Sequence, residues 1–156
     1  MTQCYTRLKT HISIEVVDMK KNNRLNKRKI VPICEAALAK DLALLKELLI
    51  LGADINEKDY NGLTAIYYAT QNGDYEMTKF LIENGADYEV RDPYGNTPLS
   101  NAVFYYKKMD SDDSLIKLLI DSGADINAEN NYGVSPLSLA HTIAGFPYLS
   151  LFDDKS

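Results

Sequence analysis

The chain is poor in the residues that metal sites, disulfide frameworks and nucleophilic catalysis require. Its 156 residues include two cysteines, two histidines and no tryptophan. Cys4 and Cys34 are too few for a disulfide framework, and His11 and His141 provide no metal-ligand cluster of useful spacing. The sequence also lacks a phosphate-binding glycine loop, a Cys-x-x-Cys pair and a Gly-x-Ser-x-Gly turn. We therefore predict that the protein is not an enzyme and has no catalytic residues, no metal site and no cofactor.

Long apolar runs are also missing. Even the most apolar segment, residues 42–51, contains Lys46 and Glu47, whereas a membrane-spanning helix needs about 20 mostly apolar residues. Near the N-terminus, Glu15 and Asp18 interrupt what would have to be the apolar part of a signal peptide. We therefore expect no membrane span and a cytoplasmic location.

Positive charge is scarce after residue 30. Residues 1–30 contain eight Lys or Arg and two acids, whereas residues 31–156 contain nine Lys or Arg and 20 acids. Because phosphate contacts come from clustered Lys and Arg, we do not expect nucleic acid to bind the acidic part. The basic run of residues 20–29 lacks aromatic residues for base stacking, and it is typical of a solvated linker or an electrostatic attachment. Residues 1–29 are predicted to be a basic N-terminal extension or cap.

The remaining chain contains an internal repeat. Gly-Ala-Asp triplets begin at Gly52, Gly85 and Gly123, which are 33 and 38 residues apart. The turn sequences of residues 59–62, 92–95 and 130–133 recur at the same two intervals. Since two independent landmarks report one period, the chain is predicted to be a repeat protein.

Each repeated unit predicts two helices. Thr97-Pro98 and Ser135-Pro136 place a hydroxyl at the helix N-cap and proline in the first turn, whereas Val31 provides no hydroxyl. The second helix carries apolar residues one turn apart, which we expect to be buried. One unit cannot cover its own apolar face, so the copies are expected to stack. The apolar residues include Leu45, Leu48, Leu49, Leu81, Ile82, Ile116, Leu119 and Ile120.

These motifs resemble the ankyrin repeat family. Residues 96–102 and 134–140 match the start of the family's first helix, and residues 81–87 match the end of its second helix. The resemblance covers residues 26 to about 145 and implies an all-α solenoid of helix-turn-helix units with short, hairpin-like turn tips. The predicted repeats are about 26–58, 59–91 and 92–129, followed by a partial C-terminal cap at 130–156, within a repeat domain of residues 30–156.

The chain departs from the family pattern in two places. Cys34, Tyr67, Ser100 and Ser138 replace a histidine, so the hydrogen bonds that this histidine makes between repeats are expected to be lost or rebuilt. The third unit is five residues longer than the second, and alignment from both ends places the extra residues within 104–113. We expect a lengthened loop between helices, whose aromatic part either extends the first helix or forms a contact surface. Residues 148–152 are expected to form one turn that covers the core.

Partner contacts in the ankyrin family come mainly from the turn tips and the first helix of each repeat. Carried over position by position, the resemblance implies a set of partner-binding residues rich in Tyr, Asn and Arg, and Tyr and Arg often anchor interfaces. Leu63 and Val134 are expected to be exposed apolar members, although a tip tyrosine can also lie across a turn and cover its backbone. The set comprises Lys58, Tyr60, Asn61, Leu63, Tyr68, Gln71, Asn72, Arg91, Tyr94, Asn96, Asn101, Phe104, Tyr105, Glu129, Asn131, Tyr132 and Val134.

The resemblance implies a protein–protein interaction module. We expect a monomer that binds another protein through its concave face and turn tips, as an adaptor or an inhibitor. One specific form is an immunity or antitoxin-like protein that neutralises a basic toxin or enzyme, which the acidic repeats favour. The alternative is an adaptor whose basic N-terminus tethers it to nucleic acid or to a membrane.

Overall fold

The computed structural model describes residues 31–106, 113–143 and 145–153. Within these ranges the protein has eight α-helices and no strand. The predicted basic extension, residues 1–29, lies outside the described residues, and so does the 107–112 part of the predicted insertion. The helices are α2 (Pro32–Leu38), α3 (Leu42–Ile50), α4 (Ala65–Gln71), α5 (Tyr75–Glu83), α6 (Pro98–Tyr105), α7 (Ser114–Asp121), α8 (Pro136–Thr142) and α9 (Ser150–Asp153).

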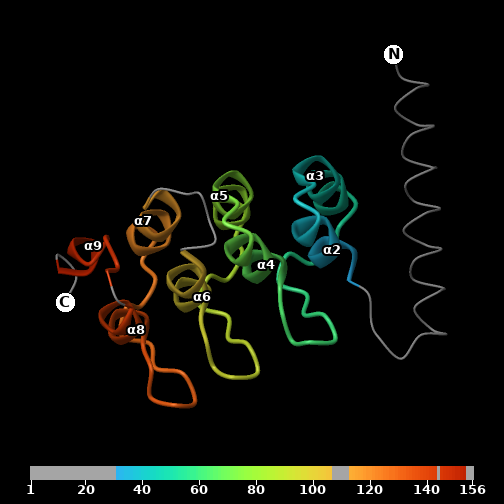
Figure 1. The fold of residues 1–156 in the computed structure, drawn as a ribbon. Helices are drawn as coiled ribbons and strands as arrows, with labels where there is room; N and C mark the ends of the chain where they lie inside the picture. Colours follow the sequence, from blue (N-terminus) through green and yellow to red (C-terminus); the bar gives the residue numbers. More distant parts are fainter. Residues whose placement is uncertain (1–30, 107–112, 144, 154–156) are drawn as a thin grey trace, which may run out of the picture.

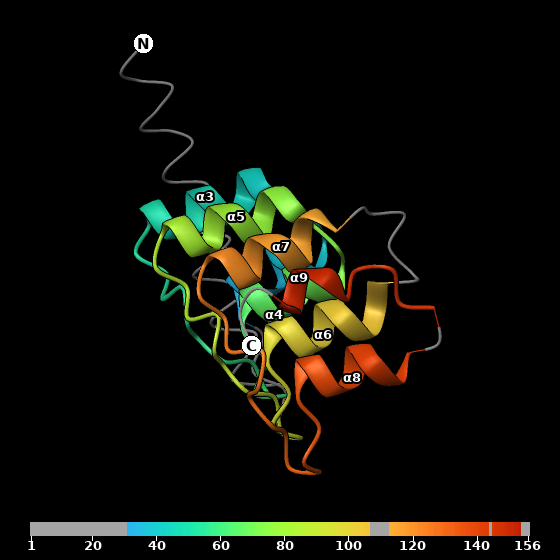
Figure 2. The ribbon, with the colours of Figure 1, turned by 90° about the vertical axis from the view of Figure 1, so that its left-hand side faces the viewer.

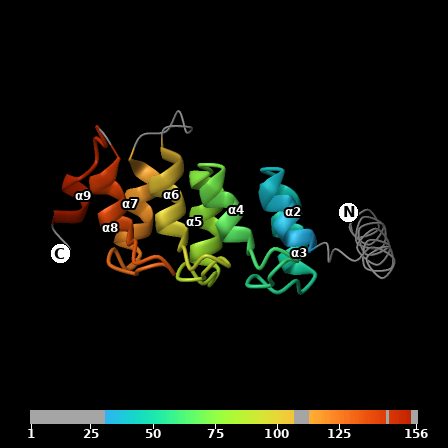
Figure 3. The same ribbon diagram turned by 60° about the horizontal axis from the view of Figure 1, so that its bottom comes forward.

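The helices form two rows, as the sequence predicts for a stacked repeat protein (Figure 1). Helices α2, α4, α6 and α8 form an inner row, in which each helix packs against the next; this row is seen along its length in Figure 3. Helices α3, α5 and α7 form the outer row. The predicted all-α solenoid is therefore confirmed.

Short polar side chains begin most of these helices. Thr97 and Ser135 cap α6 and α8 as predicted, because each side chain accepts a hydrogen bond from the backbone N–H three residues later. Asp41 and Asp74 cap α3 and α5 in the same way, and both were missed in the sequence. Thr64 stands at the N-cap of α4 but forms no capping bond, and its buried hydroxyl has no partner.

The apolar core consists of two clusters. One joins the helices of residues 31–90, and the other joins those of residues 99–152. Ile82 and Tyr88 pack against both clusters and so connect them. The predicted burial of the second helices is confirmed at most positions, but Leu49 and Ile82 are only half-buried.

The C-terminal end is closed by aromatic residues. Phe152 in α9 is fully buried, and Phe146 is nearly so. The ring of Phe146 contacts the ring of Tyr106 edge to face, at 4.7 Å between centroids. The predicted terminal turn that covers the core is therefore confirmed, and α9 is that turn.

The start of the aromatic tract extends the first helix, which is one of the two expected alternatives. Helix α6 continues to Tyr105, so Phe104 and Tyr105 are helical and not part of a loop. Phe104 is 63% exposed and packs edge to face on Tyr105. The first two aromatic residues of the tract therefore extend the inner helix.

Three turn tips project from the inner row on the side away from the outer helices (Figure 2). We call residues 59–63, 92–96 and 130–134 the first, second and third tips. Each tip is closed by a hydrogen bond from the N–H of its first residue to the carbonyl of its last, at 2.9, 3.1 and 3.0 Å. We call the surface between the tips and the inner helices the groove, and the pockets described below open on it.

Candidate functional site

One side chain organises each tip. Asp59, Asp92 and Asn130 open the three tips, and each uses one side-chain oxygen to accept hydrogen bonds from the backbone N–H groups two and four residues later. The donor–acceptor distances are 2.8 and 2.9 Å in the first tip, 2.8 and 2.8 Å in the second, and 2.9 and 3.0 Å in the third. Asp and Asn favour such turns because their short side chains reach their own backbone.

Helix α4 binds both of the tips that flank it. The Tyr68 hydroxyl donates to Asp59 at 2.6 Å, and the adjacent Tyr67 hydroxyl donates to Asp92 at 2.7 Å. Burial, followed by the hydrogen bond to Asp59, raises the pKa of Tyr68 to about 12. Burial and the bond to Asp92 raise the pKa of Tyr67 further above its ordinary value. These phenols therefore keep their protons and act as donors at neutral pH.

Asp92 is ionised at neutral pH. Burial by itself would raise its pKa, but hydrogen bonds from Tyr67, Asn96 and Tyr94 outweigh burial and hold the pKa below its ordinary value. The carboxylate accepts from the Tyr67 hydroxyl and the Asn96 side chain through one oxygen, and from two backbone N–H groups through the other. A fixed negative charge therefore stands where the second tip meets the inner helices.

The second and third tips bind each other directly. Asn130 donates to the side-chain oxygen of Asn96 at 2.7 Å, and the backbone N–H of Asn131 donates to the carbonyl of Tyr94 at 3.0 Å. Arg91 donates to the carbonyls of Gly95 and Glu129 at 3.0 and 2.7 Å. The two tips consequently form one connected edge of the groove.

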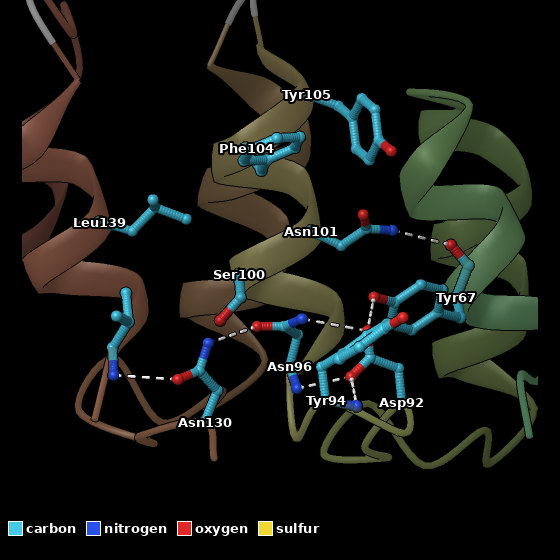
Figure 4. A pocket seen from close by; sticks show the side chains of 11 residues that line it. Tyr67, Asp92, Tyr94, Asn96, Ser100, Asn101, Phe104, Tyr105, Asn130 and Leu139 are labelled. Carbon is cyan, nitrogen blue, oxygen red and sulfur yellow. Dashed lines mark hydrogen bonds between the residues drawn. The ribbon is translucent and has the colours of Figure 1, made fainter. Parts of the chain in front are cut away.

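A pocket of about 480 Å³ opens beside this edge, where α6 and α8 face the second and third tips (Figure 4). Its position follows from one small residue. In α4 the bulky Tyr67 reaches the next tip, whereas the equivalent residue of α6 is Ser100, which reaches only Thr97. The pocket is lined by Tyr67, Asp92, Tyr94, Asn96, Ser100, Asn101, Phe104, Tyr105, Asn130, Val134 and Leu139.

A smaller pocket of about 150 Å³ lies where α2 meets the first tip. It has the same kind of wall, because it combines an aspartate and a tyrosine of the tip, Asp59 and Tyr60, with Tyr68 of α4. Glu35 of α2 adds a second acid. Both pockets are therefore bordered by a tip carboxylate and aromatic rings.

The structure brings part of the predicted site together. Tyr94, Asn96, Asn101, Phe104, Tyr105 and Val134 line the larger pocket, and Tyr60 and Tyr68 line the smaller one. Sequence reasoning missed Tyr67, Asp92, Ser100 and Asn130 as lining residues. Ser100 and Tyr67 carried a signal, since both stand where the family pattern has histidine.

Several predicted contact residues have their polar groups engaged within the protein. Asn72 donates to the carbonyls of Ala37 and Leu38 at 3.2 and 3.1 Å, and Asn131 donates to the carbonyl of Pro93 at 3.1 Å. Gln71 donates to the hydroxyl of Tyr105 at 3.4 Å. These side chains, like that of Arg91, connect neighbouring repeats.

The other predicted contact residues differ in exposure. Lys58, Asn61, Glu129 and Tyr132 are exposed. Leu63 and Val134, expected to be exposed apolar residues, are half-buried because the tip folds back toward the inner helices. The apolar strip at the tips is therefore narrower than the sequence suggested.

Among the described residues, no three of the His, Cys, Asp and Glu side chains gather into a group that could hold a metal ion. No helix in the same ranges is long and apolar enough to cross a membrane.

Comparisons with known proteins identify similar sequences. A sequence model for ankyrin repeats in three copies matches residues 33–130. L-asparaginase of Dirofilaria immitis is 35% identical over 79 residues, which are 50% of this chain and 13% of that protein. The mitochondrial liver isoform of glutaminase of Mus musculus is 30% identical over 94 residues, which are 60% of this chain and 16% of that protein. Putative ankyrin repeat protein L271 of Acanthamoeba polyphaga mimivirus is 37% identical over 71 residues, which are 45% of this chain and 10% of that protein.

The matched region is a small share of each relative. It spans at most 16% of the length of these three proteins. The two enzyme names describe whole proteins of which this chain resembles a minor part, so neither activity is transferred to it.

Proposed function

The chain belongs to the ankyrin repeat family, and we propose that it binds another protein in the groove between its tips and inner helices, as a non-enzymatic adaptor or inhibitor. Ankyrin repeats are generally protein–protein interaction modules, and the general role follows from membership. The location of the interface and the nature of the partner are our proposal.

The observation that carries this proposal is a row of exposed tyrosines. Tyr60, Tyr94 and Tyr132 lie near the ends of three successive tips and are 54, 60 and 73% exposed. Large aromatic side chains anchor many interfaces, and an exposed set on one edge is typical of a contact surface. The hydrogen bonds within and between tips hold their backbone in place, which reduces the entropic cost of binding.

The charge of the groove favours a basic partner. The described residues contain 17 acidic and six basic side chains, and α4, α6 and α8 contain no Lys or Arg. Of the six basic residues, three belong to outer helices, namely Lys46, Lys79 and Lys117. Lys40 and Arg91 donate to backbone carbonyls, and Lys58 is exposed beside the first tip. Complementary charge speeds association and selects partners. An inhibitor that neutralises a basic toxin or enzyme is the specific form of the proposal that this charge supports.

The test begins with recovery of the partner from native cells and continues with variants. Replacing a tyrosine that anchors the partner by alanine should weaken binding by about 2 kcal/mol or more. Isothermal titration measures this loss. Ile50→Ala is the control, because Ile50 is 69% exposed on the outer helix α3. A Tyr60, Tyr94 and Tyr132 triple alanine variant that binds with wild-type affinity would place the interface elsewhere.

A tethered adaptor is a second candidate, favoured by the eight basic residues among the first 30. Clustered basic residues attract anionic lipid and nucleic acid in a salt-dependent way. Deletion of residues 1–29 should then abolish binding to anionic vesicles or to duplex DNA. Equal binding by the full and shortened chains would reject the tether.

A further inference from the structure

We propose that the pocket beside Ser100 receives an arginine side chain of the partner protein. This inference rests on the proposed function, because it specifies the chemistry of the partner that the groove binds. Three independent features of the pocket support it: its empty space, an unused hydrogen-bond acceptor on its wall, and its negative charge.

The space beside Ser100 arises because the repeats are not identical. At the junction of α4 and the second tip, the Tyr67 ring fills the gap and its hydroxyl reaches Asp92. At the next junction Ser100 is too short to reach Asn130, which is held by Asn96 instead. The resulting volume of about 480 Å³ lies within the range of pockets that hold ligands.

Asn101 provides the unused acceptor. This side chain is 95% buried, since only 5% of it is exposed. Its amide nitrogen donates to the Tyr67 carbonyl at 3.2 Å and to the Thr70 hydroxyl at 3.4 Å. Its amide oxygen has no hydrogen-bond donor among the described residues, and in Figure 4 it faces the side of the pocket where Phe104 and Tyr105 lie. A ligand that donates from a charged group to this oxygen would replace solvent there, and charge-assisted hydrogen bonds are stronger than neutral ones.

The charge of the pocket selects a cation. Asp92 on the wall is ionised, and Arg91, the nearest base in the sequence, is already bound to the carbonyls of Gly95 and Glu129. Helices α6 and α8 add no Lys or Arg. An anionic ligand would meet a fixed negative charge without a compensating cation, whereas a basic side chain is attracted.

Among basic side chains the walls favour arginine over lysine. Tyr94 and Phe104 are 60 and 63% exposed and present aromatic rings at the rim. A guanidinium is planar, stacks on aromatic rings and carries five donors, whereas an ammonium is more strongly hydrated. The half-buried Val134 and Leu139 provide apolar surface for the aliphatic stem.

The test is a titration that needs no partner. Nα-acetyl-arginine methylamide is added to the ¹⁵N-labelled full chain, and backbone and Asn side-chain signals are followed by NMR. The citrulline derivative is the matched probe, because it has nearly the same shape without the charge. We expect saturable shifts at Ser100, Asn101 and Asn96, with the arginine probe binding at least tenfold more tightly than the citrulline probe. Equal binding of both probes, or shifts confined to other residues, would overturn the proposal.

The chain's own repeats suggest the variants. Ser100→Tyr copies the residue of α4 and fills the pocket, while Ser138→Tyr makes the same change in α8, outside the lining. We expect the first to weaken binding of the arginine probe at least tenfold and the second to leave it unchanged. Two other variants test the pocket even if Ser100→Tyr does not fold. Asn101→Leu copies Leu139 and removes the acceptor. Asp92→Asn copies Asn130 and removes the charge. Asp59→Asn controls for the loss of one tip carboxylate.

Two outcomes separate this inference from the proposed function. If the triple tyrosine variant still binds the partner and the arginine probe still binds at Ser100, the proposed interface is wrong but the pocket is still selective for arginine. If the triple variant loses its partner but Ser100→Tyr keeps wild-type affinity for it, the arginine proposal fails alone. A synthetic peptide of residues 20–29 that binds at Ser100 more tightly than the arginine probe would assign the pocket to the chain's own basic run and overturn the assignment to a partner.

Discussion

Helices α4 and α6 occupy equivalent places in successive repeats, yet they meet the tips in different ways. Tyr67 and Tyr68 of α4 donate to Asp92 and Asp59, so the helix itself holds the tips on both of its sides. At α6 the short Ser100 leaves a pocket, and the second and third tips hold each other through Asn96, Asn130 and their neighbours. Equivalent backbones can therefore support either a filled junction or an open one, depending on one side chain.

The two core clusters, of residues 31–90 and 99–152, also differ in composition. The cluster of residues 31–90 contains Cys34, buried with its sulfur 3.6 Å from the carbonyls of Glu57 and Leu63. The cluster of residues 99–152 ends on the aromatic residues of the C-terminal cap. Because Ile82 and Tyr88 join the clusters, we expect the halves to unfold together.

The largest effects are expected in the cores. Leu81 and Leu119 are fully buried at equivalent positions of α5 and α7. Leu81→Ala and Leu119→Ala should each lower the free energy of unfolding by about 2 to 5 kcal/mol, because each removes buried apolar atoms and leaves a cavity. Urea denaturation followed by circular dichroism measures this loss, and both variants should show one transition. Two separate transitions would show that the halves are independent units.

A smaller effect is expected at the tips. Gly62 and Gly95 both adopt positive φ angles, 77° and 83°, but a Cβ on Gly95 would lie 2.7 Å from the Asn131 side chain and 2.9 Å from its backbone nitrogen. Gly62→Ala should cost about 1 to 2 kcal/mol through backbone strain alone. Gly95→Ala should cost about 3 kcal/mol, because it also separates the second tip from the third.

Thermal or urea denaturation of the two glycine variants checks this difference. Gly133→Ala is the control within the third tip, since its φ is 73° and a Cβ there meets nothing within 4 Å. Equal losses at all three glycines would contradict the direct contact between the second and third tips.

Because Tyr67 of α4 holds the second tip, the free energy of unfolding should depend on pH in the alkaline range. Tyr67→Phe removes a hydrogen bond to ionised Asp92 and should cost about 1 to 2 kcal/mol at pH 7. Folding raises the pKa of Tyr67 above its ordinary value of 10.0, so its contribution is complete below pH 10 and decreases as the pH rises further. Urea denaturation between pH 7 and pH 11 should show a steeper loss for the wild type than for Tyr67→Phe. Parallel curves would mean that the Tyr67 proton is not held by the fold.

The smallest effect is expected for the ion pair of α7. Lys117 lies 2.9 Å from Asp121 one turn away, and both side chains are more than half exposed. Solvent and salt screen such a pair, so Lys117→Ala should leave the free energy of unfolding nearly unchanged. A loss near that of Leu119→Ala would show that surface charge, and not the core, stabilises this half.

Short-range sequence patterns were enough to predict the repeat, the two-helix unit and the turns. These features depend on short-range rules: hydroxyl caps before proline in α6 and α8, apolar residues one turn apart, and Asp or Asn at the start of each tip. Such signals act within a few residues and recur at one period, which makes them readable without coordinates. The same local reading was wrong about the exposure of Leu63 and Val134, and it left open whether Phe104 extends the first helix.

The contacts between residues of different repeats could not be predicted in this way, because they depend on how the repeats stack. Tyr67 bonds to Asp92 across 25 positions, and Arg91 bonds to the carbonyl of Glu129 across 38. Asn72 and Asn131 were predicted as partner contacts, but they donate to carbonyls of neighbouring repeats. Stacking places these carbonyls beside them, and the sequence does not show which groups stacking brings together. The pocket at Ser100 also depends on stacking, because it is the space that the adjacent helix and tips leave unfilled.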